Sequence, residues 1–228
     1  MNPKKAQRKR HPVLVFVLVL LTTLCLFGIS FRVILLPPFT AFFAENTVNS
    51  PLSDLSHSEL VEVAEMGRAY VVGDSGALLP EGEDERVAFT PEVVSHMEDV
   101  RAVIQDALIL TVAFVILLLA TLIYTGRKVG RQTLSVGLLF GGVSAVFVAL
   151  VLSLIGVLNF ESLFIAMHDM LFAEGNWIFS EDSLLICAYP LPFWIGMALA
   201  WALTLLLLST IVSVLGLMLR QEKKHRSK

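Results

Sequence analysis

Charge is scarce in this chain, and it is missing altogether from four long stretches. Asp, Glu, Lys and Arg make up 16% of the 228 residues, against about 25% in soluble domains, and the mean hydropathy is +0.76. The uncharged stretches are residues 13–31, 107–124, 134–158 and 193–219. Each is long enough, at about 1.5 Å per helical residue, to cross roughly 30 Å of hydrocarbon. The sequence therefore excludes an ordinary soluble domain and predicts an all-α membrane protein with four transmembrane helices.

Cysteine is also rare, and motifs that hold metals or nucleotides are absent. Cys25 lies in the first apolar stretch and Cys187 in a polar segment, so we expect neither a disulfide nor a cysteine-based metal site. The sequence has no H-E-x-x-H pair and no glycine-rich phosphate loop. We therefore expect no metal, no cofactor and no nucleic-acid partner.

Acidic residues are nearly absent from three segments that are rich in Lys and Arg. MNPKKAQRKRHP, TGRKVGRQ and RQEKKHRSK carry five, three and five basic residues, with Glu222 as the single acid. Residues 37–106, in contrast, contain fourteen Asp or Glu and three Arg, and residues 159–192 contain five acids and no Lys or Arg. Because basic flanks mark the cytoplasmic side, we expect both termini inside and the two acidic segments outside.

This charge pattern sets the expected topology. We expect the first apolar stretch to be a retained anchor, because it is longer than the apolar core of a cleaved signal. The expected parts are a basic cytoplasmic tail (1–12), a first span (13–36), an extracellular segment (37–106), a second span (107–124), a cytoplasmic loop (125–133), a third span (134–158), a second extracellular segment (159–192), a fourth span (193–219) and a second basic tail (220–228). We expect the two extracellular segments to form a small extracellular domain, because the first is too short to bury a core alone.

Two helices are predicted in the first extracellular segment. Apolar residues at near-helical spacing predict a helix from about Ser58: Leu60, Val63, Ala64 and Met66. The stretch GDSGALLPEGEDERVAF is rich in turn residues and predicts a loop or a short hairpin. Thr90 is a good N-cap and Pro91 suits the first helical position, so we expect a second helix that begins there and continues into the second span.

The second extracellular segment opens with the pattern of a helix that lies in the membrane interface. Its apolar residues recur at helical spacing: Phe160, Leu163, Phe164, Met167, Leu171 and Phe172. A glycine-containing turn with Trp177 follows, and SLLICAYPLPFW leads into the fourth span. For Trp177, Tyr189 and Trp194 a simple role as aromatic anchors at headgroup level stays open.

Two histidines, His96 and His168, are the candidate catalytic residues. Both are expected outside the membrane and within about a dozen residues of an apolar stretch, so the topology can bring them together near the outer leaflet. His96 and Asp99 share one helix face, and the carboxylate can reach the imidazole and fix its tautomer. The alternative for this pair is a solvated polar face. Asp169 follows His168, although neighbours on a helix point apart.

The residues around these histidines resemble a known family. SHMEDVR (residues 95–101) and MHDMLFAEGNWIF (residues 167–179) are similar to motifs of the bacterial lipoprotein intramolecular transacylase family, Lit. Its members are four-span proteins with a His-x-x-Asp-Val motif in the first outer segment, and with a second histidine followed by aromatics and Trp-x-Phe after the third span. Met167 and Leu191 depart from the pattern, where an aromatic residue and an acid are expected.

The resemblance implies an acyltransferase of the bacterial plasma membrane with its active site at the extracellular face. Its partner would be a diacylated lipoprotein, whose N-terminal cysteine is thioether-linked to diacylglycerol. The enzyme would move the sn-2 acyl chain to the α-amine of that cysteine and give the lyso form. His96 and His168 match the two histidines of the family, and Asp99, Asp169 and Trp177 would support them or contact the substrate.

This reaction suits two histidines. Amine and ester belong to one molecule, so attack closes a ring of roughly eight atoms, and fixed geometry replaces much of the entropy cost. The α-amine has a pKa near 8, and an imidazole is matched to take its proton. A second imidazole can donate to the oxyanion or to the leaving oxygen. The sequence leaves open which histidine has which role.

Functions of other classes compete with this hypothesis. A non-catalytic membrane scaffold or accessory subunit would use the extracellular domain for protein contacts and leave the histidines as interfacial polar residues. A zinc site would use both histidines with Asp99 or Asp169. A transporter or channel is disfavoured, because the spans carry no buried charge apart from Arg32, which is expected to reach the outer interface.

Overall fold

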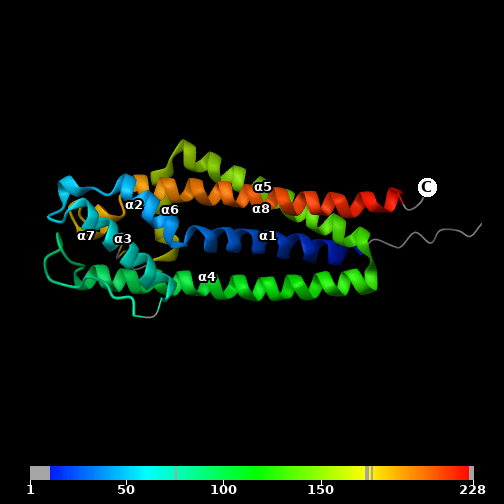
Figure 1. The fold of residues 1–228 in the computed structure, drawn as a ribbon, viewed down its shortest axis with the longest axis horizontal. Helices are drawn as coiled ribbons and strands as arrows, with labels where there is room; N and C mark the ends of the chain where they lie inside the picture. The colour runs from blue at the N-terminus through cyan, green and yellow to red at the C-terminus, as the bar shows by residue number, and fades with distance from the viewer. Residues whose placement is uncertain (1–10, 75, 173–174, 176, 226–228) are drawn as a thin grey trace, which may run out of the picture. The chain divides into compact units, whose positions relative to one another are not determined.

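The computed structural model describes residues 11–225, apart from residues 75, 173–174 and 176. In these residues the secondary structure is helical, with one isolated bridge between Glu81 and Phe89, so the predicted all-α class is confirmed. The elements are α1 (Pro12–Ile34), α2 (Pro37–Thr47), the 3₁₀ turn η1 (Ser50–Leu52), α3 (His57–Val72), α4 (Pro91–Tyr124), the π turn η2 (Thr125–Val129), α5 (Arg131–Leu158), α6 (Phe160–Leu171), α7 (Leu184–Ala188) and α8 (Leu191–His225), as Figure 1 shows.

Four of these helices are long and apolar enough to cross a membrane. They cover Pro12–Ile34, Pro91–Val129, Arg131–Leu158 and Leu191–Arg220, and they contain the four predicted spans except at one boundary. The first span was expected to reach residue 36, but α1 ends at Ile34 because Leu36 precedes Pro37 and takes an extended conformation, with φ −73° and ψ 145°. Pro37 then starts α2, a helix that the sequence pattern did not predict.

The predicted helix start at Pro91 is confirmed. α4 begins at Pro91 and continues without a break for 34 residues into the second apolar stretch. The link to the next long helix is shorter than the expected loop. η2 ends at Val129, Gly130 turns the chain with φ 129°, and α5 begins at Arg131.

The chain folds into two compact units. The first comprises Met1–Ser30, Leu110–Val151 and Leu203–Lys228, and the second comprises Phe31–Ile109 and Leu152–Ala202. Each of the four long helices contributes one part to each unit. The first unit is held together by close helix contacts at glycines and hydroxyls, as is common between membrane helices. A Cβ on Gly141 would overlap Thr22, and the hydroxyl of Ser135 donates to the Gly216 carbonyl over 2.8 Å.

The core of the second unit forms around α3, which packs on α2 and α7. α3 starts with a capping box in which Ser56 and Glu59 satisfy each other's backbone N–H groups, and it ends at Gly73 with φ 81°. Its apolar side is buried, as the spacing predicted for Leu60, Val63 and Ala64. The loop after α3 returns through the Glu81–Phe89 bridge, which places buried Phe89 just before α4.

Tyr189 is a core residue of this unit and not a headgroup anchor. Its side chain is buried, and its hydroxyl donates to the Ala64 carbonyl of α3 over 2.6 Å. Gly67, one helical turn further along α3, leaves the room for this hydroxyl, because a Cβ there would overlap it. Arg68 is also buried. Its guanidinium group forms ion pairs with Glu65 and Asp74 and donates a hydrogen bond to the Leu35 carbonyl.

We predict that Gly67→Ala destabilises the protein by about 1–3 kcal/mol, because the added methyl group displaces the Tyr189 hydroxyl from its buried hydrogen bond. Thermal unfolding in detergent should show a midpoint lower by roughly 2–4 °C for each kcal/mol lost. Gly156→Ala is the matched control, because a Cβ at this helical position meets its neighbours only at ordinary contact distances of 3.8 and 3.9 Å. Equal midpoints for the two variants would contradict the packing described for Tyr189.

Candidate active site

The N-terminal part of α4 holds His96. Val93, His96 and Met97 are all buried here, and Val93 and Met97 belong to the core of the second unit. The His96 side chain is only 6% exposed. Asp99, predicted on the same face, is exposed, and its negative charge acts on the imidazole.

The short helix α6 holds His168. Asn159 caps this helix, since its side-chain oxygen accepts from the Ser162 N–H over 2.9 Å. The predicted amphipathic helix is therefore confirmed as a helix, although His168 is its single buried residue. Asp169 is exposed.

The structure brings the two imidazoles together. The ring centroids of His96 and His168 lie 6.2 Å apart, and the ring planes differ by 28°. Each ring is therefore within reach of a single small group placed beside both of them. The spatial convergence expected from the topology is present in the fold.

Aromatic rings surround the pair. Phe172 contacts both imidazoles, at centroid distances of 5.0 Å to His96 and 5.5 Å to His168. Phe179 contacts His96 at 5.6 Å, and Phe164 and Trp177 contact His168 at 4.0 and 4.9 Å. Trp177 was predicted as a supporting residue, and its ring lies against His168.

The three phenylalanines of this cluster were not predicted as site residues. For two of them the signal was in the sequence, because Phe164 and Phe172 stand four residues before and four residues after His168. Residues at that spacing lie on one side of a helix. Phe179 lies outside α6, so helical spacing gives no signal for it, but it is the last residue of the Trp-x-Phe motif that resembles the family.

A backbone carbonyl fixes the tautomer of His168. Its Nδ1 lies 2.9 Å from the Phe164 carbonyl oxygen. A carbonyl only accepts, so Nδ1 carries the proton in the neutral ring, and Nε2 presents a lone pair. His96 differs, because its Nδ1 is buried and has no hydrogen-bond partner among the described residues.

Both imidazoles are held in the neutral form. Burial is the main cause that lowers the pKa of His96 to about 4; a positive charge on His168 would lower it further, and Asp99 opposes the shift. Burial also lowers the pKa of His168, against the opposing effects of the Phe164 carbonyl and of Asp169. At neutral pH the site therefore holds two uncharged rings that can donate and accept protons.

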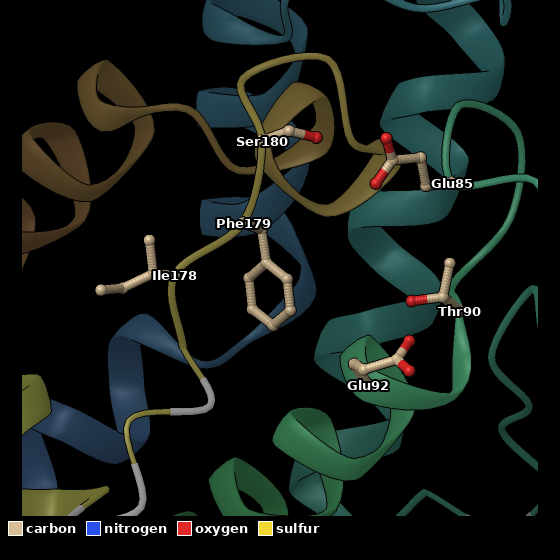
Figure 2. A pocket seen from close by; sticks show the side chains of 6 residues that line it. All are labelled: Glu85, Thr90, Glu92, Ile178, Phe179 and Ser180. Atoms are coloured by element: carbon tan, nitrogen blue, oxygen red, sulfur yellow. The ribbon is translucent and has the colours of Figure 1, made fainter.

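A polar pocket lies beside this cluster. It has a volume of about 340 Å³ and is lined by Glu85, Thr90, Glu92, Ile178, Phe179 and Ser180. Figure 2 shows the Phe179 ring extending into it, with Glu85, Thr90 and Glu92 on the facing side. Neither histidine lines the pocket. In the described part of the chain, no group of three or more His, Cys, Asp or Glu side chains has a geometry that could hold a metal ion.

Comparison with known proteins gives a family match over most of the chain. The family model described as "Lipoprotein intramolecular transacylase Lit" matches residues 13–194. An uncharacterized protein of Aquifex aeolicus (strain VF5) is 26% identical over 170 residues, which cover 72% of this chain and 74% of that protein.

Solved structures of similar fold come from Bacillus cereus. The membrane-integral lipoprotein intramolecular transacylase Lit of that organism has a TM-score of 0.78 and 19% identity, over 94% of this chain and 97% of that one. A variant of it with a histidine replaced by arginine has a TM-score of 0.73 and 20% identity, over 94% of both chains. At these identities the likeness shows that the fold is shared.

We predict that the two buried histidines stay neutral at pH values below the usual pKa of histidine. In ¹⁵N-labelled protein in micelles, His96 should titrate near pH 4 and His168 below pH 6.5, because burial disfavours the charged ring. In the unfolded chain both should titrate near 6.5. The unfolded state therefore binds more protons, and these groups reduce stability as pH falls from about 6.5 toward 4. A folded-state midpoint at or above 6.5 for His96 would contradict this description.

Proposed function

Because the chain belongs to the lipoprotein intramolecular transacylase family, we propose that this membrane acyltransferase moves the sn-2 acyl chain of a diacylglyceryl-cysteine lipoprotein to the α-amine of the same cysteine. The product is the lyso form, an N-acyl S-monoacylglyceryl lipoprotein. The observation that carries the proposal is the pair of buried imidazoles 6.2 Å apart. Two such rings supply the proton transfers that the reaction needs.

Holding the substrate is the first task of the enzyme. The attacking nitrogen and the ester carbon belong to one molecule, and their bond closes a ring of roughly eight atoms, so orientation replaces much of the entropy cost. The aromatic cluster of Phe164, Phe172, Trp177 and Phe179 offers apolar contacts for the glyceryl and acyl groups around the two imidazoles. No nucleophile from the protein is required on this route.

His168 is proposed as the general base. Its Nδ1–H donates to the Phe164 carbonyl, so Nε2 is free to take a proton from the amine as nitrogen attacks the ester carbonyl. The bond between the acyl carbonyl carbon and the ester oxygen at the sn-2 position then breaks. The imidazolium returns the proton to that oxygen. Atoms and charges balance, and the lipoprotein is isomerised without gain or loss of mass.

His96 is proposed as the hydrogen-bond donor to the oxyanion. Its pKa of about 4 makes it a poor base at neutral pH, but a neutral imidazole still donates from one ring nitrogen. A neutral histidine that polarises a carbonyl is a known catalytic arrangement. Asp99 is proposed to support His96 through its charge, and Asp169 to do so for His168, since each raises the pKa of its neighbour.

The site is proposed to face the outer leaflet. The three basic segments support a topology with both termini in the cytoplasm, which leaves residues 37–106 and 159–192 outside. Lipid-modified cysteines carry their acyl chains in that leaflet, and exposed apolar side chains of α6, such as Ile165 and Met170, suit contact with lipid. Trp177 is proposed to contact the substrate next to His168.

Single substitutions of the two histidines test this function. We expect His168→Ala to lower kcat by about 10²–10⁴-fold through loss of the base, and His96→Ala by about 10²–10³-fold through loss of a donor. The assay is formation of the N-acyl product from a synthetic diacylglyceryl-cysteine peptide. His57→Ala is the matched control, because this exposed histidine lies outside the aromatic cluster and pairs with Glu45 at 3.5 Å. Full activity in either site variant would refute the proposal.

Asparagine substitutions separate the two roles. An asparagine amide donates a hydrogen bond but does not take a proton at neutral pH. His96→Asn should therefore keep more activity than His96→Ala, while His168→Asn should be as inactive as His168→Ala. The reverse pattern in the same product assay would mean that His96 is the base and His168 is the donor.

A further inference from the structure

We propose that Phe179 is a specificity-determining residue that keeps water from the histidine pair, so that the site transfers an acyl chain instead of hydrolysing it. This inference rests on the proposed function, because it concerns the competition between two nucleophiles at the same ester. It assigns a role to a side chain that makes no polar contact with either histidine.

The competing reaction needs nothing beyond water and the same two imidazoles. Water would attack the sn-2 ester carbonyl and lose a proton to the base, and the C–O bond would break with return of that proton to the glyceryl oxygen. The products would be a free fatty acid and a lipoprotein that has lost one acyl chain. A base that serves an amine also serves water, so the protein must discriminate by excluding water.

Phe179 contacts a histidine that would bind water readily. The Phe179 and His96 ring centroids are 5.6 Å apart, with an interplanar angle of 53°. His96 is 6% exposed, and its buried Nδ1 has no partner among the described residues. A buried nitrogen of this kind gains a hydrogen bond from any water that reaches it.

The same ring also lines the polar pocket. Glu85, Thr90, Glu92 and Ser180 line this pocket of about 340 Å³ with oxygen atoms, and the carboxylates of Glu85 and Glu92 belong to exposed residues. Figure 2 shows the ring of Phe179 on the side of the pocket that faces Glu85, Thr90 and Glu92. One aromatic ring therefore contacts both the water-accessible pocket and His96.

The ratio of hydrolysed to isomerised lipopeptide, measured by mass spectrometry, distinguishes this role from simple packing. Transacylation leaves the mass of the lipopeptide unchanged, and hydrolysis removes one acyl chain. In the full-length enzyme, we expect the wild type to give the isomer, and we expect Phe179→Ala to raise the hydrolysed fraction by about tenfold or more. In H₂¹⁸O the released fatty acid should carry the label. Phe179→Leu, which keeps part of the apolar bulk, should give a smaller increase.

Ile178→Ala is the matched control. Ile178 lines the same pocket but is 75% exposed, and it presents no ring to His96. Its product ratio should equal that of the wild type. If Phe179→Ala and Phe179→Leu lower total turnover but leave the ratio of the two products unchanged, the ring only packs and the inference is overturned. Where Phe179→Ala does not fold, Phe179→Leu decides. A wild type that forms no N-acyl product would instead overturn the proposed function.

Discussion

Burial of two imidazoles against one another is the constraint on which the site depends. A charged ring beside a second one in an apolar cluster is unfavourable, because burial penalises the charge and each positive charge repels the other. His96 and His168 are therefore neutral at physiological pH. A neutral imidazole has one N–H donor and one acceptor nitrogen, so each ring can both donate and accept a hydrogen bond. It also leaves the site without a positive charge that would repel a substrate ammonium group.

Two local features place these rings. Pro91 starts α4 close enough to His96 that the imidazole lies in the first turns of the helix, where Val93 and Met97 bury the same side. Asn159 starts α6, a helix of 12 residues, and this start sets the position of His168 near its end. The hydrogen bond from His168 Nδ1 to the Phe164 carbonyl lies within that one helix. The orientation of His168 is thus fixed locally, and the fold has only to bring the two helices together.

Much of this organisation could be predicted from the sequence. The four apolar helices follow from uncharged stretches, and the start of α4 follows from Thr90 and Pro91, because capping and the fixed φ of proline act locally. The choice of the two histidines as candidate catalytic residues followed from their expected side of the membrane and from the family motifs. Their separation of 6.2 Å did not, because it results from tertiary packing of segments far apart in the chain.

Other features could not be predicted, for reasons that differ between residues. Tyr189 has the composition and position of a membrane-interface anchor, and only the space left at Gly67 shows that its hydroxyl is buried against α3. Phe179 is part of the Trp-x-Phe motif, but it lies outside a helix, so no periodic pattern predicts that its ring contacts His96. The unpartnered Nδ1 of His96 depends on what the rest of the fold places near it. The arrangement of the site thus depends on contacts that a sequence pattern does not encode.

In the proposed reaction, an acyl chain moves within one molecule, from glycerol oxygen to cysteine nitrogen, at the histidine pair. The most direct measurement is tandem mass spectrometry of the N-terminal peptide of a lipoprotein from bacterial cells with and without this protein. We expect equal total masses, with one fatty acid on nitrogen only when the protein is present. Peptides with identical acyl positions in both cell lines would contradict it.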